Sequence, residues 1–291
     1  MKYRGIVLLA KEGHSVALCC DLLGVSSSGF YDWRKRPPSN RELKNGELKA
    51  KILNIFSDSK ETYGSPRIKA SLEKDGEVIG KGKVAAIMRR EGLSARRKKA
   101  FRPKTTINNP SDKKSPRVFE IEKTEVVKEN QVWVSDLTYI PTTEGFMYLV
   151  VVMDLFNREI KGWDLSDSME ATHTTAAMHR ALTNIEGKPD DLVFHSDQGV
   201  QYCTTELRKI FSFLGITQSM SRKGNCYDNA FAESFFHTLK NELGEKCFGG
   251  KELARKAIFE YIEAWYNTKR LHSSLGYMSP REYAEQNSYA A

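Results

Sequence analysis

Two kinds of hydrophobic pattern divide the chain. Over residues 1–100, apolar residues recur at helical spacing in short segments that glycine, serine or proline interrupts. The segments QVWVSDLTYI (131–140), FMYLVVVMDLFNREI (146–160) and IKGWDLS (160–166) are instead rich in β-branched and aromatic residues. They predict three consecutive strands in an antiparallel meander, with the first turn at 142–145. The stretch FRPKTTINNPSDKKSPR (101–117) between the two regions lacks periodicity and is typical of a linker.

The N-terminal region predicts two helical units. In HSVALCCDLLGVSSSGFYDWRKR, Gly24 can turn the chain between two helices and Ser26 can cap the second one, a pattern typical of a helix–turn–helix. Residues 41–58, 65–76 and 81–91 predict three further helices, with Ser65 as the N-cap and Pro66 at the first helical position of the middle one. We interpret these three as a second helical DNA-binding unit of the same type.

The C-terminal region alternates between strands and helices. The pattern predicts a helix at 169–185, a strand at 191–197, a helix at 204–216, a strand at 217–221, and helices at 229–243 and 251–270. This order matches an α/β ribonuclease-H-like fold, a mixed sheet with helices on both faces. We therefore expect a helix–turn–helix at 1–40, a second helical DNA-binding domain at 41–100, a basic linker at 101–125, a ribonuclease-H-like core at 126–250, and a C-terminal helix and tail at 251–291.

Charge supports a division of labour between the two regions. Residues 1–120 hold 27 Lys and Arg against 13 Asp and Glu, whereas residues 121–291 hold 18 against 24. A net charge of +14 in the first region, beside −6 in the second, predicts a polyanion-binding arm joined to a different module. The candidate DNA-binding residues are basic residues of the helical units and two near the 229–243 helix: Arg34, Lys35, Arg36, Arg89, Arg90, Arg96, Arg97, Lys98, Lys99, Arg222 and Lys223.

Composition excludes several other classes of protein. No run of eighteen apolar residues predicts a membrane span, and the N-terminus lacks the cleavage site of a signal peptide. The five cysteines form no C-x-x-C pair, which argues against a zinc ribbon or a disulfide framework. We therefore expect a cytoplasmic protein with free thiols and no membrane partner.

Three acidic residues interrupt apolar segments. Asp136 lies mid-strand, Asp197 at the end of a later strand, and Glu233 within an apolar helix. Each alone has an ordinary structural explanation: a satisfied polar strand residue, the start of a turn, or a surface helix residue. In the predicted topology, however, all three converge at one sheet edge, where they would repel one another without a balancing cation. Hard oxygen ligands at this density suit Mg²⁺ or Mn²⁺. Asp154 and Asp228 are further acids that could approach the same site.

The spacing of these acids carries a family resemblance. Thirty-five residues separate Asp197 from Glu233, which resembles the D-D-(35)-E signature of retroviral integrases and many bacterial transposases. The blocks VWVSDLTYIPT, FHSDQGVQY, SRKGNCYDNAFAESFFHTLKNE and YNTKRLHSSLGYMSPREY, in this order, are similar to the second-frame protein (OrfB) of the IS-three family of insertion sequences. The resemblance covers nearly the whole chain.

The resemblance implies a metal-dependent DNA transposase that cleaves strands and transfers them to new DNA. Asp136 would bridge two metal ions, with Asp197 holding one ion and Glu233 the other. The implied partners are double-stranded DNA, both as the inverted-repeat ends of the element and as its target, and further copies of the chain in a dimer or larger synaptic complex. An upstream-frame protein (OrfA) is a further implied partner, since residues 41–58 keep no heptad and no zipper is evident.

Other residues near the triad have open roles. Lys240 lies two helical turns after Glu233 on the same face, and the resemblance implies contact with DNA near the reacting phosphate. His237 shares this face and is a second candidate for DNA binding. His195 lies two positions before Asp197 on the same strand face, so it could be a metal ligand, although its position favours a core residue or a hydrogen-bond partner of a metal ligand. Arg270, His272 and Ser273 could contact DNA from the loop after the 251–270 helix, or simply lie on the surface.

Two functions compete with the transposase. A DNA-binding regulator with an inactive core would have no need of three converging acids. A ribonuclease-H-like nuclease that only hydrolyses would have little use for two N-terminal DNA-binding units and the C-terminal block. A Mg²⁺-dependent strand-transfer assay on labelled DNA ends distinguishes the three.

Overall fold

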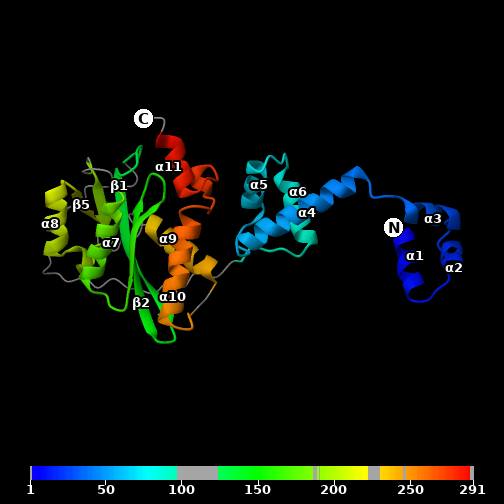
Figure 1. Ribbon diagram of the computed structural model, residues 1–291, viewed down its shortest axis with the longest axis horizontal. Helices are drawn as coiled ribbons and strands as arrows, with labels where there is room; N and C mark the ends of the chain where they lie inside the picture. The colour runs from blue at the N-terminus through cyan, green and yellow to red at the C-terminus, as the bar shows by residue number, and fades with distance from the viewer. Residues whose placement is uncertain are drawn as a thin grey trace. The chain divides into compact units, whose positions relative to one another are not determined.

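The protein forms two compact units. The computed structural model describes residues 2–96, 124–185, 189, 191–221, 230–244 and 247–288 (Figure 1). The first unit covers Met1–Ser57 and the second Asp58–Ala291. The boundaries of the five expected domains stay a prediction.

Three helices of the first unit pack around a small apolar core. They are α1 (Lys2–Lys11), α2 (Val16–Leu22) and α3 (Ser27–Lys35). The buried side chains of Ile6, Cys19, Cys20 and Phe30 pack together between them. The predicted helix pair is thus formed by α2 and α3, and the Ser26 hydroxyl accepts the Gly29 N–H at 3.1 Å, as expected for an N-cap. Sequence analysis did not predict α1, which completes this core.

Three more helices follow. Helix α4 (Asn40–Asp58) begins with a capping box, in which the Ser39 N–H donates to the Glu42 carboxylate at 2.9 Å and the Glu42 N–H donates to the Ser39 hydroxyl at 3.3 Å. In the second unit, α5 (Ser65–Lys74) and α6 (Lys81–Arg90) pack against each other. The predicted cap of α5 was wrong by one position, because Gly64 is the N-cap and Ser65 is already helical.

A five-stranded mixed sheet forms the centre of the second unit. Its strands are β1 (Val132–Thr142), β2 (Gly145–Asp154), β3 (Ile160–Ser166), β4 (Val193–Ser196) and β5 (Thr217–Met220), in the order β3-β2-β1-β4-β5. The first three form the predicted antiparallel meander, whereas β4 runs parallel to β1 and β5 parallel to β4. The predicted ribonuclease-H-like topology is therefore confirmed.

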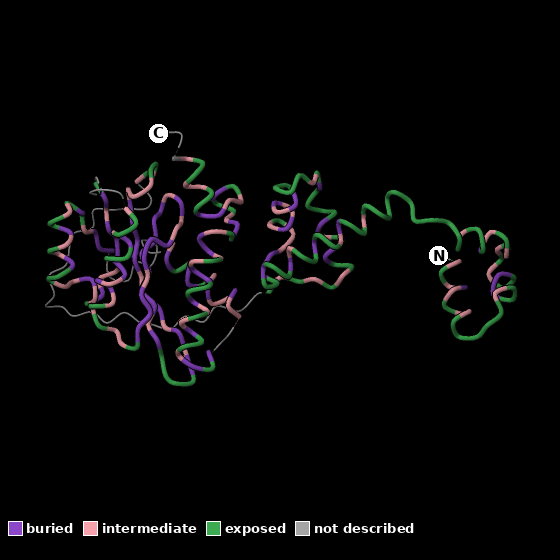
Figure 2. The backbone as a smooth tube through the Cα atoms, in the orientation of Figure 1, coloured by how far each residue is buried: buried purple, intermediate pink, exposed green. Residues whose placement is uncertain are grey.

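Helices cover both faces of this sheet (Figure 1). Helices α7 (Ala171–Thr183) and α8 (Thr205–Leu214) pack over one face with Trp133 and Phe194 in a shared core. Helices α9 (Ala230–Leu243) and α10 (Lys251–Phe259) pack over the other with Val132 and Val134. The sheet lies buried between these layers (Figure 2). Because side chains alternate along a strand, Asp136 and Thr138 face the α9 side.

The C-terminal block, residues 251–288, adds structure that the pattern did not predict. After α10 the chain continues as a π-helical segment, η3 (Glu260–Tyr266), and ends with α11 (Pro280–Ser288). Short 3₁₀ turns lie at η1 (Val200–Tyr202) and η4 (Ser273–Leu275). Among the helices that the structure describes, none combines the length and apolar character that crossing a membrane requires.

Candidate active site

Asp136 lies at the centre of the site, in the middle of β1. Its side chain is half-buried on the sheet face that α9 covers. Burial raises the pKa of Asp136 well above its ordinary value, and the negative charges of Asp197 and Glu233 raise it further. A hydrogen bond from the Leu137 backbone and the charge of Lys240 act in the opposite direction. Three carboxylates from separate parts of the chain therefore lie close enough to affect one another.

The pairing of β1 with β4 brings Asp197 to Asp136. These strands are parallel, with Val134 opposite His195, so the residue two positions beyond each lies at the same level. Asp197 follows the last residue of β4, and its Oδ1 accepts the Gly199 N–H at 2.9 Å. That hydrogen bond holds the carboxylate in the turn after the strand. The strand-end position predicted for Asp197 is the one observed.

Glu233 approaches from the helix that covers β1. It lies in the first turn of α9, where Ala232, Phe235 and Phe236 are buried and pack in the core shared with β1. Glu233 itself is exposed. A carboxylate in the first turn is also favoured by the helix dipole. The apolar residues around Glu233 thus anchor the helix, and the acid projects from it.

Lys240 provides positive charge beside these acids. Its ammonium donates a hydrogen bond of 2.6 Å to the hydroxyl of Thr138, the next residue after Asp136 on the same strand face. Burial lowers the pKa of Lys240, and the negative charge of Asp136 partly opposes this effect. Thr138 is a site residue whose role as the partner of Lys240 sequence analysis did not predict. Its position two residues from Asp136 was the available signal.

The donor set suits a divalent cation. Since neighbouring carboxylates contribute to the raised pKa of Asp136, a bound cation would relieve their repulsion. Within the described residues, no three His, Cys, Asp or Glu side chains are grouped closely enough to hold a metal ion. The residue types therefore fit metal binding, and the observed side-chain positions are wider than a loaded site would need.

The two candidate histidines have protein partners. His237 is exposed on α9, and its Nε2 accepts a hydrogen bond of 2.7 Å from the Asn241 amide. His195 is fully buried in β4, and its Nδ1 lies 3.0 Å from the Ser219 hydroxyl of β5. The core position expected for His195 is therefore confirmed.

The candidate DNA-binding residues that the structure describes lie on the surface. Exposed side chains are present at Arg34, Lys35, Arg36, Arg89, Arg90 and Arg96. Of these, Arg96 pairs with Glu61 at 2.9 Å and Arg90 with Glu91 at 3.2 Å. The remaining candidates, together with Asp228, lie outside the described residues: Arg97, Lys98, Lys99, Arg222 and Lys223.

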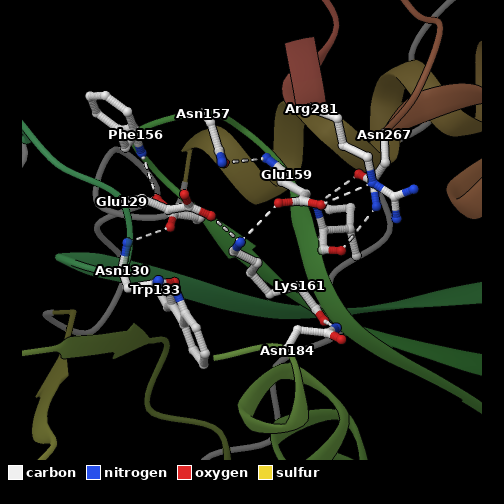
Figure 3. A network of polar contacts seen from close by, with 12 residues as sticks. Glu129, Asn130, Trp133, Phe156, Asn157, Glu159, Lys161, Asn184, Asn267 and Arg281 are labelled. Atoms are coloured by element: carbon white, nitrogen blue, oxygen red, sulfur yellow. Dashed lines mark hydrogen bonds and ion pairs between the residues drawn. The ribbon is translucent and has the colours of Figure 1, made fainter. Parts of the chain in front are cut away.

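Asp154 has a local structural role at the end of β2. Its carboxylate is fully buried and accepts backbone hydrogen bonds from Asn130 at 2.7 Å and from Phe156 at 2.8 Å. Burial raises the pKa of Asp154 to about 6, although these hydrogen bonds lower it. Figure 3 shows the surrounding polar network, in which Lys161 contacts Glu129 and Glu159. Asp154 pairs with Trp133 across β1 and β2, whereas Asp136 pairs with Val151. Because Trp133 and Val151 belong to the cores on opposite faces of the sheet, Asp154 is not on the face that carries the acidic site.

The loop that could have contacted DNA contains a buried ion pair. Arg270 is only 4% exposed and bonds to Glu242 of α9 at 2.7 Å, so it is not available to DNA. Burial and the charges of nearby arginines lower the pKa of His272 to about 2, which leaves this imidazole neutral. Ser273 alone of the three is exposed. Sequence analysis did not single out Glu242, because a glutamate in a helix is usually a surface residue.

Known protein families match along most of the chain. Residues 127–226 and 214–280 match two models described as integrase core domains. Residues 42–101 match an HTH-like domain. The integrase core models together span the sheet, α9, α10 and η3, and end at the start of α11.

Curated relatives are similar over nearly their full length. A 31 kDa protein of insertion element IS600 from Shigella sonnei is 38% identical over 268 residues, which are 92% of this chain and 97% of the relative. Transposase InsF of insertion sequence IS3A from Escherichia coli strain K12 is 36% identical over 284 residues, covering 94% and 95%. The chain belongs to the IS-three family of insertion-sequence transposases. The transposase is thus a polynucleotidyl transferase of the DDE type that acts on DNA.

Solved structures give a weaker likeness. The catalytic core domain of HTLV-2 integrase, determined in complex with magnesium, is 16% identical with a TM-score of 0.42, covering 53% of the transposase and 96% of that chain. A chain of the simian T-cell lymphotropic virus intasome, determined in complex with PP2A regulatory subunit B56 gamma, is 13% identical with a TM-score of 0.46, covering 80% of the transposase and 74% of that chain.

Proposed function

We propose that Asp136, Asp197 and Glu233 are the catalytic carboxylates of this transposase and hold two divalent ions, Mg²⁺ or Mn²⁺. The observation that carries the proposal is the placement of the acids: Asp197 follows β4 at the level of Asp136 on β1, and Glu233 lies on α9, which packs against β1. The charges of Asp197 and Glu233 contribute to the raised pKa of Asp136. The negative charges of acids from the end of β4 and from α9 disfavour the charged form of the acid on β1. A shared cation offsets that repulsion and gives the three carboxylates a common task.

The carboxylates divide the work between two ions. Asp136, the most central of the three, would contribute to holding both ions, whereas Asp197 and Glu233 would each hold one. The chemistry supplied by bound ions is activation of the attacking oxygen and stabilisation of the leaving oxygen in an in-line displacement. In the first step, water or a hydroxyl group attacks a phosphodiester at the element end, and a new P–O bond forms as the bond to the 3′ oxygen breaks and frees a 3′-hydroxyl. In the second, this hydroxyl attacks a target phosphodiester, so that one P–O bond forms as another breaks.

Lys240 positions the DNA at this site. Its ammonium donates a hydrogen bond to Thr138, two residues from Asp136 on β1. Because Lys240 is partly buried, an opposite charge attracts its ammonium more strongly than it would on an open surface. A lysine is repelled by metal ions and is therefore not a ligand. Its suitable partner is a DNA phosphate or base edge next to the reacting bond. His237, exposed on the same helix, is a weaker candidate for a neighbouring DNA contact.

The basic helical units hold the DNA. We assign duplex contacts to the exposed basic side chains of α3, α6 and the segment after α6, and to the basic residues outside the described ranges: Arg34, Lys35, Arg36, Arg89, Arg90, Arg96, Arg97, Lys98, Lys99, Arg222 and Lys223. The bound DNA comprises the inverted-repeat ends of the element and its target. Two ends require at least two active sites, so we propose a dimer or a larger complex, with OrfA as a further partner, acting in the cytoplasm.

A strand-transfer assay tests this proposal. Labelled DNA ends and an unlabelled target are incubated with the transposase over a Mg²⁺ titration, and hydrolysed and joined products are resolved. We expect both products to require Mg²⁺ or Mn²⁺ and to vanish with EDTA. Products that form at full yield with EDTA would overturn the metal proposal, and hydrolysis without joining would leave a simple nuclease.

A further inference from the structure

A buried carboxylate ties the active-site helix to the C-terminal block. Glu242 lies in the last turn of α9, nine residues after Glu233, and is 7% exposed. Its Oε2 accepts hydrogen bonds from the Tyr261 hydroxyl at 3.0 Å and from the Trp265 indole at 3.4 Å, both in η3. The helix that carries Glu233 and Lys240 is therefore held at its far end by polar contacts and not by apolar packing alone.

Arg270 supplies the opposite charge in a fork. Its Nε and Nη2 both donate to Glu242, at 2.9 Å and 2.7 Å, and its Nη1 lies 3.3 Å from Nε2 of the neutral His272. The ring of Tyr266 packs edge-on against His272 at 4.9 Å and against Phe235 of α9 at 4.7 Å. A fork with two donors fixes direction as well as distance, which a single ammonium does not.

The same loop is gripped by the start of α5. The Leu271 N–H donates to the Tyr63 hydroxyl at 2.8 Å, and the Arg67 guanidinium donates to the Leu271 carbonyl at 3.0 Å. The rings of Tyr63 and Trp265 lie 5.8 Å apart. Both backbone groups of the residue after Arg270 are thus satisfied by the helical segment that the HTH-like match covers.

We propose that Arg270 is a positioning residue, which holds α9 in register with β1 and thereby places Glu233 and Lys240. Tyr63 and Arg67 extend these contacts, here called the brace, to the DNA-binding helices. The proposal rests on the roles of Glu233 and Lys240 given above. The contacts run in series from α5 through Leu271 and Arg270 to Glu242. These contacts link α5 to the helix that carries Glu233 and Lys240.

The competing explanation is that the ion pair only stabilises the fold. Removing one partner leaves an uncompensated buried charge, so a loss of stability is expected under either explanation. Replacing both partners with apolar residues of similar length removes the charges together and often restores stability, although it cannot restore the direction of the fork. The double variant therefore separates positioning from stability.

The experiment measures single-turnover end cleavage by the full chain at saturating DNA, together with DNA affinity and thermal unfolding. We expect Arg270→Lys and Glu242→Gln to lower the rate constant by at least about tenfold, because a misplacement of about 1 Å at a reacting centre has effects of this size. The DNA affinity of these single variants should stay within about twofold of the wild type, since the brace does not contact DNA. The double variant, Glu242→Met with Arg270→Met, should still cleave slowly even where its melting temperature recovers. Tyr63→Phe, which removes one hydroxyl, should cause a smaller loss of rate.

Two controls make the result decisive. Lys256→Gln removes the exposed ion pair between Lys256 of α10 and Glu260 at the start of η3. Phe211→Leu weakens the core on the sheet face opposite α9. Both should keep the wild-type rate constant. A double methionine variant that cleaves at the wild-type rate, or a Phe211→Leu variant as slow as Arg270→Lys, overturns the brace. If Glu233→Gln itself cleaves normally, the proposed function fails instead.

Discussion

The ammonium of Lys240 donates a hydrogen bond of 2.6 Å to the hydroxyl of Thr138, which joins the active-site helix α9 to strand β1. Thr138 lies two residues after Asp136, so the lysine lies near the central acid while its hydrogen bond is made to Thr138. Seven residues earlier on α9, Glu233 acts on the same acid by its charge. One helix therefore presents an acidic and a basic side chain, Glu233 and Lys240, to one strand.

Lys240→Ala should reduce end joining by about ten- to a hundredfold, the effect of losing a hydrogen bond to a charged group worth about 1.5–3 kcal/mol. It should also weaken binding of the element end and leave metal binding unchanged. Lys240→Arg should keep part of the activity, because the charge persists while its geometry changes. The measurement is strand transfer with matched element ends.

Thr138→Val serves as the matched variant, since it removes only the hydroxyl that Lys240 contacts. It should lower end joining less than Lys240→Ala, because the charge remains available to DNA. A wild-type rate for Lys240→Ala would make this lysine an ordinary structural residue.

The three acids should be individually essential. Asp136→Asn, Asp197→Asn and Glu233→Gln should each abolish cleavage, with a loss of at least about a thousandfold, while DNA binding and thermal stability stay near wild type. The measurement is Mg²⁺-dependent cleavage of a labelled end. Glu206→Gln, an exposed acid in the first turn of α8, is the control and should cleave normally. Robust cleavage by any triad variant removes that residue from the site.

The exposed basic side chains should govern salt dependence. Exchanging Arg89 and Arg90 for glutamine should reduce the slope of log affinity against log salt by about 1 for each phosphate that the protein no longer neutralises. The expected weakening is similar for every DNA sequence, because phosphate contacts carry no sequence information. Affinity is measured between about 50 and 200 mM salt. Lys256→Gln on α10 should leave the slope unchanged, and an unchanged slope in the double arginine variant would exclude both residues from the DNA interface.

Asp154 should make stability depend on pH. Its pKa in the folded protein is about 6, above the ordinary value of 3.8, so the folded state binds its proton more tightly than the unfolded state does. The stabilisation is complete below the ordinary value of 3.8 and is lost as pH rises through about 6. The loss is of the order of 3 kcal/mol, at about 1.4 kcal/mol per pKa unit.

Asp154→Asn removes this titration. The free energy of unfolding of the wild type should therefore fall relative to the variant between about pH 4 and 6.5, as measured by urea denaturation at each pH. Parallel stability profiles for the two proteins would contradict the raised pKa.

Local pattern was enough to predict the order of the strands and long helices from β1 to α10, although not α1 or α11. The β-branched and aromatic runs became β1 to β3, and the apolar helix around Glu233 became α9, because period and composition reflect which side of an element meets the core. The three acids were recognised for the same reason, since a charge within an apolar segment stands out. Their assignment as ligands stays a prediction, because it depends on ions and DNA.

The tertiary structure alone decided which of the charged residues act together. Asp154 interrupts an apolar strand as Asp136 does, yet backbone donors from Asn130 and Phe156 satisfy it. Arg270 has the sequence pattern of a surface arginine, yet it is buried against Glu242, twenty-eight residues earlier. The pairing of β4 beside β1 and the contact of Lys240 with Thr138 likewise join distant segments. The sequence determined where each element and each unusual charge lies, whereas folding determined their partners, because an ion pair or hydrogen bond depends on distance in space and not on separation along the chain.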